Sequence, residues 1–291
     1  MKWLILSDED CSDFINKMKK EFSKADFFIY SYESVSSFDF DFFSKITHAI
    51  FLNFQKESND FSFILGFFSG SGVNIYSISD FNKKKFSNEK IKVFKNKNEL
   101  FSSIVSLSES ILKEEEKKNA LEYLFKNGYP FDSENFSHFI KKWNKKICEY
   151  YVRAGMDVNV TDLDGTPLLN IASREDNLAA VKWLCSCGAN LNLVSKDRGY
   201  TAIMDSVWRG NAEIVKFLIK KGSPLNTISK EGQTMLILAV GADRTEIVKM
   251  LSEGGADPDI KDGMGMSAYD YAKLFKKSEI LSILEKYHKE Q

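Results

Sequence analysis

The stretch VWRGNAEIVKFLIKKGSPLN, residues 207–226, consists of a polar turn, an apolar helical segment, and a glycine followed by a second polar turn. Within it, Ile214, Val215 and Leu218 are spaced i, i+1 and i+4, which places them along one face of a helix. The same spacing recurs one unit later at Ile247, Val248 and Leu251. The sequence therefore predicts a repeated amphipathic helix whose apolar stripe has no partner within its own unit.

Two sets of glycines give the period of this repeat. One set opens the units and the other closes them, and members of each set are 33 or 34 residues apart by subtraction of their numbers. The opening set is Gly165, Gly199, Gly232 and Gly265, and the closing set is Gly155, Gly188, Gly222 and Gly255. A glycine just past a helix ends it with a positive φ at no steric cost. We therefore expect each unit to be one layer of a stacked array.

The units resemble the ankyrin repeat from about residue 117 to residue 291. They read DGTPLLNIASREDNLAAVKWLCSCGANLN, RGYTAIMDSVWRGNAEIVKFLIKKGSPLN and EGQTMLILAVGADRTEIVKMLSEGGADPD, and then MGMSAYDYAKLFKKSEILSILEKYHKEQ. The ankyrin signature is a glycine turn, Thr-Pro-Leu, an alanine pair, Val-x-x-Leu-Leu and Gly-Ala-x-Asn. The resemblance implies two helices and a β-turn finger in each unit, stacked into a helical solenoid that binds a protein partner on its concave face.

Hydroxyl side chains mark the expected helix starts. Thr201, Thr234 and Ser267 stand where a hydroxyl would cap the first helix of a unit by accepting from an unpaired backbone N–H. In the unit that begins GTPLL, Thr166 comes one residue earlier relative to its glycine. Either the turn is one residue shorter in that unit or the cap is altered.

The repeat weakens toward its amino-terminal end. Segments ending at Gly128 and Gly155 match the closing half of a unit but lack the Thr-Pro-Leu opening. We therefore expect degenerate capping repeats over residues 113–160, and ankyrin repeats with a polar carboxy-terminal cap over residues 161–291.

The resemblance implies that partner contacts come from the finger residues beside the opening glycine and from the end of the first helix. At such positions the chain has Leu163, Asp197, Arg198, Tyr200, Trp208, Arg209 and Lys230. Because Trp, Tyr and Arg are enriched at interface hot spots, we place the centre of the contact at Tyr200, Trp208 and Arg209. The alternative is that Trp208 packs against the adjacent layer or against the first domain. Arg174 and Glu175, one unit earlier, are expected to form an exposed, solvated pair.

The first half of the chain has a different composition. Residues 1–112 contain 18 of the 24 Phe and no Pro or Arg. Short apolar runs of strand length, KWLIL, DFFIY, HAIFLNF, VNIYSI and IKVF, alternate there with helical patterns. Such alternation predicts a flavodoxin-like α/β domain with a five-stranded parallel sheet of order 2-1-3-4-5.

Ligands of such sheets bind beyond the carboxyl ends of the strands. In this chain that edge would contain Ser7, Asp8, Glu9, Tyr32 and Asn53, and the carboxylate of Asp60 would lie nearby. The layout is similar to Toll/interleukin-receptor-like domains and nucleoside deoxyribosyltransferases, a resemblance centred on the segment FILGFFSGSGVNIY. There Ile64 stands where those enzymes have the carboxylate that assists cleavage of the glycosidic bond, and Asp60 or Glu57 would have to replace it.

Composition narrows the classes of partner. The net charge of −1 provides no global attraction to nucleic acid or to an anionic membrane. The sequence has no apolar run of bilayer length and no secretory signal, so we expect a cytoplasmic protein. Cys185 and Cys187 lack a second ligand pair, which favours a structural role over a metal site. We expect no cofactor and no metal.

These features favour a protein–protein interaction module, an ankyrin scaffold or adaptor, with a non-catalytic nucleotide-type fold at its amino-terminal end. The alternative is a first domain that binds or cleaves a nucleotide such as NAD and is directed to its targets by the repeats. No catalytic residue is predicted.

Overall fold

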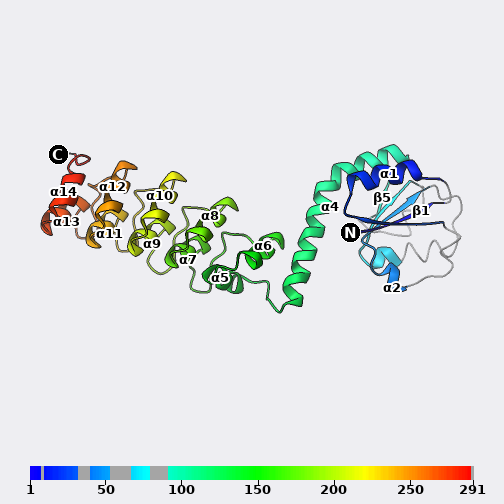
Figure 1. Cartoon of the computed structure of the whole chain (residues 1–291), viewed down its shortest axis with the longest axis horizontal. Coiled ribbons are helices and arrows are strands. Elements are labelled where there is room, and N and C mark those ends of the chain that lie inside the picture. Colours follow the sequence, from blue (N-terminus) through cyan, green and yellow to red (C-terminus); the bar gives the residue numbers. More distant parts are fainter. Residues whose placement is uncertain (8–9, 32–39, 53–66, 79–90, 290–291) are drawn as a thin grey trace. The chain divides into compact units, whose positions relative to one another are not determined.

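The computed structural model describes residues 1–7, 10–31, 40–52, 67–78 and 91–289. The chain forms two compact units, Met1–Glu115 and Glu116–Gln291. The division falls within helix α4 (Lys97–Lys126), close to the boundary expected after residue 112 (Figure 1). The charged segment LKEEEKKNA, residues 112–120, lies within α4 and is therefore helical.

The first unit is built on a parallel sheet of order β2-β1-β3-β4-β5, which confirms the predicted fold class. The strands are β1 (Lys2–Ser7), β2 (Asp26–Tyr30), β3 (His48–Leu52), β4 (Asn74–Ser77) and β5 (Ile91–Val93). The helices bounded in this unit are α1 (Ser12–Glu21) and α2 (Phe40–Phe43), together with the first part of α4. Each strand coincides with one of the predicted apolar runs.

Alternation along the strands divides the apolar residues between the two faces of the sheet. Trp3 and Ile5 of β1 pack in a cluster with residues of α1 and α4, whereas Leu4 and Leu6 pack with Phe43 of α2 on the other face. All four β1 side chains are fully buried. A strand that is apolar at successive positions is typical of a sheet covered on both faces.

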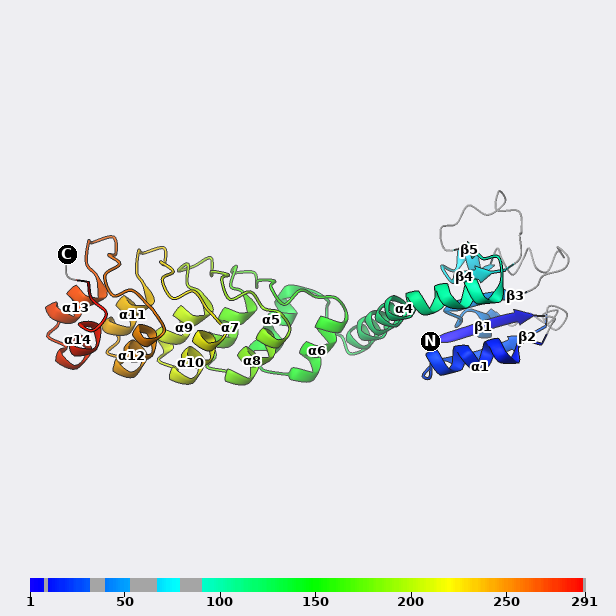
Figure 2. The same ribbon diagram turned by 90° about the horizontal axis from the view of Figure 1, so that it is seen from above.

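The second unit consists of helix pairs stacked in sequence order (Figure 2). The first helices of the pairs are α5 (Ser133–Lys141), α7 (Leu168–Arg174), α9 (Ala202–Arg209), α11 (Met235–Gly241) and α13 (Ala268–Leu274). The second helices are α6 (Lys145–Arg153), α8 (Leu178–Ser186), α10 (Ala212–Lys220), α12 (Thr245–Glu253) and α14 (Ser278–Leu284). Fingers project beside the row of first helices.

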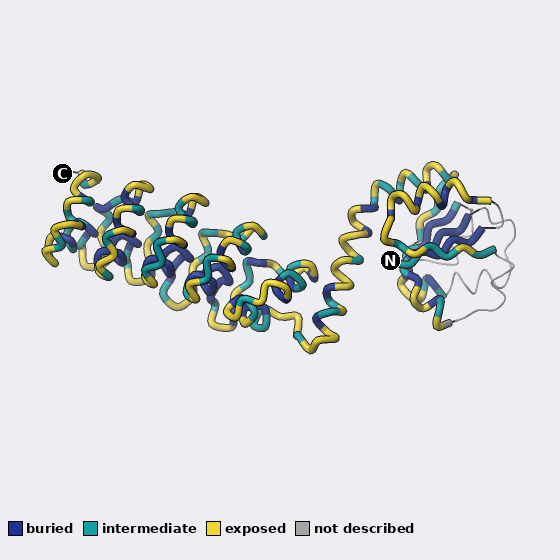
Figure 3. Tube along the Cα trace, in the orientation of Figure 1, coloured by how far each residue is buried: buried dark blue, intermediate teal, exposed yellow. Residues whose placement is uncertain are grey.

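One continuous apolar core runs through this stack from Ala120 to Leu284. The predicted stripe residues Ile214, Val215 and Leu218 are fully buried in this core, where α10 packs against α9 of its own pair and also against α8 and α12 of the neighbouring pairs. Figure 3 shows the buried side of each helix facing the interior of the stack. The layer-on-layer burial inferred from the sequence is therefore what closes the core.

Positive φ angles explain the glycine period. The opening glycines have φ between 69° and 79°, and the closing glycines have φ between 84° and 98°. Adjacent fingers also hydrogen-bond directly, since the Lys196 amide donates to the Gly165 carbonyl and the Lys230 amide to the Arg198 carbonyl, each at 3.0 Å. Fingers that approach so closely leave little room for side chains at the opening positions.

The structure decides between the two alternatives for GTPLL. Gly165 closes its finger onto Asp162, in the same way as Gly232 onto Ser229. The turn therefore keeps its length, and Pro167 replaces the capping residue and makes no side-chain cap. The longer finger is the next one, where Gly199 donates to Ser195.

Capping by hydroxyls is confirmed at two of the three predicted positions. Thr234 accepts from the Ile237 amide at 3.2 Å, and Ser267 forms a reciprocal capping box with Asp270. The prediction for Thr201 is wrong, because its hydroxyl makes no cap and is buried without a hydrogen-bond partner among the described residues. The Thr201 backbone angles, φ −77° and ψ 166°, are close to those of Thr234, so the two positions differ in the side chain and not in the path of the backbone.

Two alanine substitutions separate the two demands made on these glycines. Gly232→Ala places a Cβ 2.8 Å from the Gly263 backbone nitrogen at φ 79°, whereas Gly188→Ala meets nothing within 4 Å at φ 90°. We expect Gly188→Ala to lower the free energy of unfolding by about 1 kcal/mol from backbone strain alone. Gly232→Ala should cost at least about twice as much, measured by urea denaturation. Equal losses would contradict close finger packing.

Candidate protein-binding surface

The predicted contact residues lie on the fingers and at the end of a first helix. Leu163 is 84% exposed at a finger tip, and Trp208 is 51% exposed at the end of α9, followed by exposed Arg209. Asp197 and Lys230 are exposed on their fingers, although the Lys230 ammonium donates to the Lys196 carbonyl. About half of the Trp208 side chain is therefore exposed, so the alternative in which it packs inside the molecule accounts for only the other half.

Tyr200 departs from this pattern. The sequence suggests an exposed aromatic contact, but the Tyr200 side chain is only 3% exposed. Thr166, which follows the opening glycine one unit earlier, is likewise buried at 4% exposure. The Arg198 guanidinium lies 4.6 Å from the Tyr200 ring centroid, a cation–π contact that fixes the finger arginine. Tyr200 therefore supports the surface and does not form it.

A buried carboxylate joins two repeats beneath these residues. Asp205 of α9 is 1% exposed and accepts from Asn170 Nδ2 at 2.8 Å and from Arg174 Nε at 3.0 Å, both on α7. Arg198 Nη2 of the finger donates to the same carboxylate at 3.3 Å. Asn170 also donates to the Tyr200 carbonyl at 2.7 Å. The carboxylate thus links two first helices and the finger between them.

Asp197 completes this cluster at the surface. Arg174 Nη2 donates to Asp197 Oδ1 at 3.0 Å, so that one guanidinium bridges an exposed and a buried carboxylate. Burial raises the pKa of the Asp205 carboxyl against the lowering effect of Arg174 and Asn170. Burial acts in the same direction on Asp197, but the hydrogen bonds from Arg174, Ser195 and the Arg198 amide outweigh it and hold the Asp197 pKa well below its usual value.

The expectation of a solvated Arg174–Glu175 pair is therefore wrong for Arg174. Its side chain is 21% exposed and is engaged by both aspartates, while Glu175 is exposed. The sequence contained one signal that could have found the cluster, namely Asp205 within the otherwise apolar first helix AIMDSV. A carboxylate at a core position requires a cationic partner.

Helix ends of successive repeats form a row beside the fingers. Trp208 in α9 corresponds to Gly241 in α11 and to Leu274 in α13, because each lies at the same distance before the next second helix. Leu274 is 61% exposed, and Gly241 is also exposed. The row thus places the small Gly241 between two exposed apolar residues, Trp208 and Leu274.

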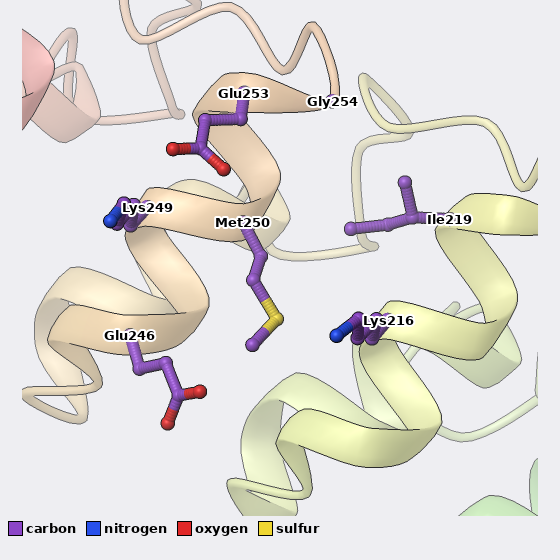
Figure 4. Close-up of a pocket in the computed structure, with 7 residues that line it drawn as sticks. All are labelled: Lys216, Ile219, Glu246, Lys249, Met250, Glu253 and Gly254. Carbon is purple, nitrogen blue, oxygen red and sulfur yellow. The ribbon is translucent and has the colours of Figure 1, made fainter.

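The second helices have a groove of their own. It has a volume of about 450 Å³ and is lined by Lys216, Ile219, Glu246, Lys249, Met250, Glu253 and Gly254. Figure 4 shows Met250 of α12 and Ile219 of α10 on its two sides, with both signs of charge at its margin. This groove contains none of the predicted contact residues.

Comparisons with known proteins agree with the stacked helix pairs. A family model for ankyrin repeats (3 copies) matches residues 136–229 and 169–262. A protein of Treponema pallidum (strain Nichols), named as ankyrin repeat-containing, is 30% identical over 237 residues, which cover 79% of this chain and 78% of the relative. The chain belongs to the ankyrin repeat-containing proteins.

Other ankyrin relatives match over shorter stretches. Ankyrin repeat and SAM domain-containing protein 6 of Rattus norvegicus is 32% identical over 97 residues, covering 33% of this chain and 11% of the relative. The ankyrin repeat protein FPV031 of fowlpox virus (strain NVSL) is 31% identical over 145 residues, covering 47% and 42%. The Treponema match is longer than the unit Glu116–Gln291, so it includes part of the α/β unit.

The predicted nucleotide edge lies largely beyond the described structure of this ankyrin protein. Ser7 ends β1 and is buried at 7% exposure. The remaining predicted residues of that edge lie outside the described residues: Asp8, Glu9, Tyr32, Asn53 and Asp60. Glu57 and Ile64 lie outside them as well.

The cysteines of the ankyrin chain are free thiols in apolar surroundings. Burial raises the pKa of Cys11, Cys185 and Cys187, and raises that of Cys148 to about 12. A thiol with a raised pKa is a poor nucleophile and a poor metal ligand. Across the described parts of the chain, no group of three or more His, Cys, Asp or Glu is placed to hold a metal ion, and no helix is long and apolar enough to cross a bilayer.

Removing the buried carboxylate tests how firmly it joins the ankyrin layers. Asp205→Ala leaves the Arg174 guanidinium and the Asn170 amide without their buried acceptor, so we expect the free energy of unfolding to fall by about 3 kcal/mol. As a control, Lys277→Ala breaks the ion pair with Asp243, whose side chain is 71% exposed, and should cost less than about 1 kcal/mol. Urea denaturation followed by circular dichroism measures both. Similar losses would show that the Asp205 cluster does not join the layers.

Proposed function

We propose that this ankyrin protein is a scaffold or adaptor that binds a protein partner on the concave face formed by the fingers and the first helices. Trp208 and Arg209 are its centre, and Leu163, Asp197, Arg198 and Lys230 surround them. The observation that supports this most is the half-exposed Trp208 at a helix end, where the equivalent residues of other repeats are Arg174, Gly241 and Leu274. Tryptophan and arginine are both enriched among binding hot spots.

The Asp205 cluster supports the proposal because it orders the residues next to Trp208. Arg198 is held by two carboxylates and by the Tyr200 ring, so little side-chain freedom remains to be lost when a partner binds. Ordering a free side chain costs about 0.5–1.5 kcal/mol on association. Fixing Arg198 in advance lowers that cost.

Charge and composition favour a protein over other classes of partner. The net charge of −1 argues against phosphate backbones and anionic lipid surfaces, which attract strongly basic proteins. Both signs of charge alternate along the fingers, as at Asp197 and Arg198. We therefore propose a protein partner met in the cytoplasm, with no nucleic acid and no membrane as ligand.

The α/β unit is proposed to be a non-catalytic second contact surface. Cys11, beside the end of β1, is buried, and its raised pKa keeps the thiol protonated. The Treponema relative matches part of this unit in addition to the repeats, which supports a shared role for the two. Binding or cleavage of a nucleotide by this unit is the alternative, and it rests on the sequence resemblance alone.

A double substitution tests the proposed surface. Trp208→Ala combined with Arg209→Ala removes one half-exposed and one exposed side chain. Because neither is fully buried in the core, the folded state should persist. We expect capture of the partner from a lysate of the native organism to weaken by about 30-fold or more, the effect of losing a hot spot worth about 2 kcal/mol or more. Quantitative mass spectrometry of proteins retained by the immobilised full chain measures this.

The control is Lys216→Ala combined with Lys249→Ala in the groove of Figure 4, on the second helices. This variant should retain the same proteins as the unaltered chain. If it loses them while the Trp208 and Arg209 variant keeps them, the partner binds the second helices and the proposed surface is wrong. Thermal unfolding of both variants verifies that the fold is intact.

A further inference from the structure

Each turn between the two helices of a repeat contains a residue with positive φ, and the next residue is the N-cap of the second helix. These pairs are Trp143–Asn144, Asp176–Asn177, Gly210–Asn211, Asp243–Arg244 and Lys276–Lys277. In the first three, the asparagine side chain accepts from the amide three residues later and caps the helix. Arg244 and Lys277 make no such cap.

Lys277 instead reaches back to the preceding repeat. Its ammonium lies 2.8 Å from Asp243 Oδ1, and Asp243 is the positive-φ residue of that repeat. The cap is thus exchanged for an ion pair between layers. A basic residue at this position therefore lies next to the positive-φ residue one repeat earlier.

Arg244 lies in the same relation to Gly210. A Cβ added to Gly210 would lie 2.6 Å from Arg244 Cζ and 2.7 Å from Arg244 Nε, so the guanidinium covers the glycine. The carboxylate that Asp243 supplies to Lys277 is missing here. Among the described residues, the Arg244 guanidinium has no ion pair and no hydrogen-bond acceptor, and Arg244 is exposed.

The missing side-chain cap at Arg244 lowers the local stability of α12. Replacing an asparagine cap by a residue that cannot cap destabilises a helix. At Lys277 the ion pair offsets this cost, but at Arg244 no described residue does. Positions that break a local rule without an internal compensation are expected at functional sites.

We propose that a carboxylate of the protein partner, from an Asp or Glu side chain, binds the Arg244 guanidinium above Gly210 and takes the place that Asp243 has on Lys277. Trp208 and Arg209 immediately precede Gly210, and Gly241 occupies the Trp208 position in the next repeat. A large apolar residue next to the acidic one would contact Trp208 over the small Gly241. The inference rests on the proposed function and specifies its partner as an acidic and apolar segment.

Two arginines supply positive charge beside Gly210. Arg209 is exposed and, within the described parts of the chain, has no ion pair, so it adds a second positive charge beside Gly210. Asp243 precedes Arg244 in the chain, and its carboxylate is engaged by Lys277. The other acidic residues near this position are Glu213 and Glu246, in the first turns of α10 and α12. A guanidinium binds a carboxylate through two parallel N–H donors, whereas neutral groups satisfy only one.

A random dodecapeptide display library, selected on the immobilised full chain, tests the inference. We expect the selected peptides to contain Asp or Glu next to a large apolar residue. For the most enriched peptide, Arg244→Gln and a Glu→Gln or Asp→Asn change in the peptide should each weaken binding about tenfold, without adding to one another. Lys249→Gln, which removes an exposed positive charge from the same helix, is the matched control and should leave affinity unchanged.

Two substitutions at Gly210 keep the test independent of Arg244. Aspartate occupies the equivalent positive-φ positions at Asp176 and Asp243, so Gly210→Asp is compatible with the turn. It supplies an internal carboxylate to Arg244, whereas Gly210→Asn has the same shape without the charge. The acidic peptide should bind the Asp variant about tenfold more weakly than the Asn variant.

The outcomes separate this inference from the proposed function. If Trp208→Ala abolishes peptide binding but the selected peptides have no acidic preference, the surface is right and the carboxylate subsite is wrong. An acidic preference that survives Arg244→Gln also overturns the subsite. If Trp208→Ala has no effect on any selected peptide, or if no peptide is selected, both proposals fail.

Discussion

The second unit depends on one constraint, which is that a pair of short helices cannot bury its apolar stripe alone. Seven- to nine-residue helices such as α11 and α12 are far too short to be stable in isolation. Their buried residues instead contribute to a core shared along the whole stack. Every repeat therefore meets the same packing problem, and the glycines with positive φ recur because the same turns must be made each time.

The shared core also explains why the surface can vary. Because stability comes from the faces between layers, the fingers and helix ends are free to differ from one repeat to the next. In the repeat of α9 and α10 they differ most, with a longer finger, a buried carboxylate at Asp205, an exposed Trp208 and a glycine at position 210 where neighbouring repeats have aspartate. Departures that cluster in one repeat are what a dedicated binding site would require.

The periodic features could be read from the sequence, and the features that depend on neighbouring repeats could not. Helix stripes such as Ile214 and Leu218 follow from local spacing, and the parallel sheet follows from bounded apolar runs. The inward turn of Tyr200 depends on the finger geometry, and the role of Arg174 depends on Asp205, which is distant in sequence. The missing cap at Thr201 could not be read from the sequence, because Thr201 has almost the same backbone angles as Thr234, which does cap its helix.

Hydrogen exchange of the full chain, followed by mass spectrometry, tests the shared core most directly. Leu218→Ala would open a cavity on α10, which packs against both α8 and α12. If burial is shared between layers, amide protection should fall in α8 and α12 as well as in α10, while α1 and the sheet keep theirs. Loss of protection confined to α9 and α10 would show that each helix pair is stable on its own, and would contradict the account.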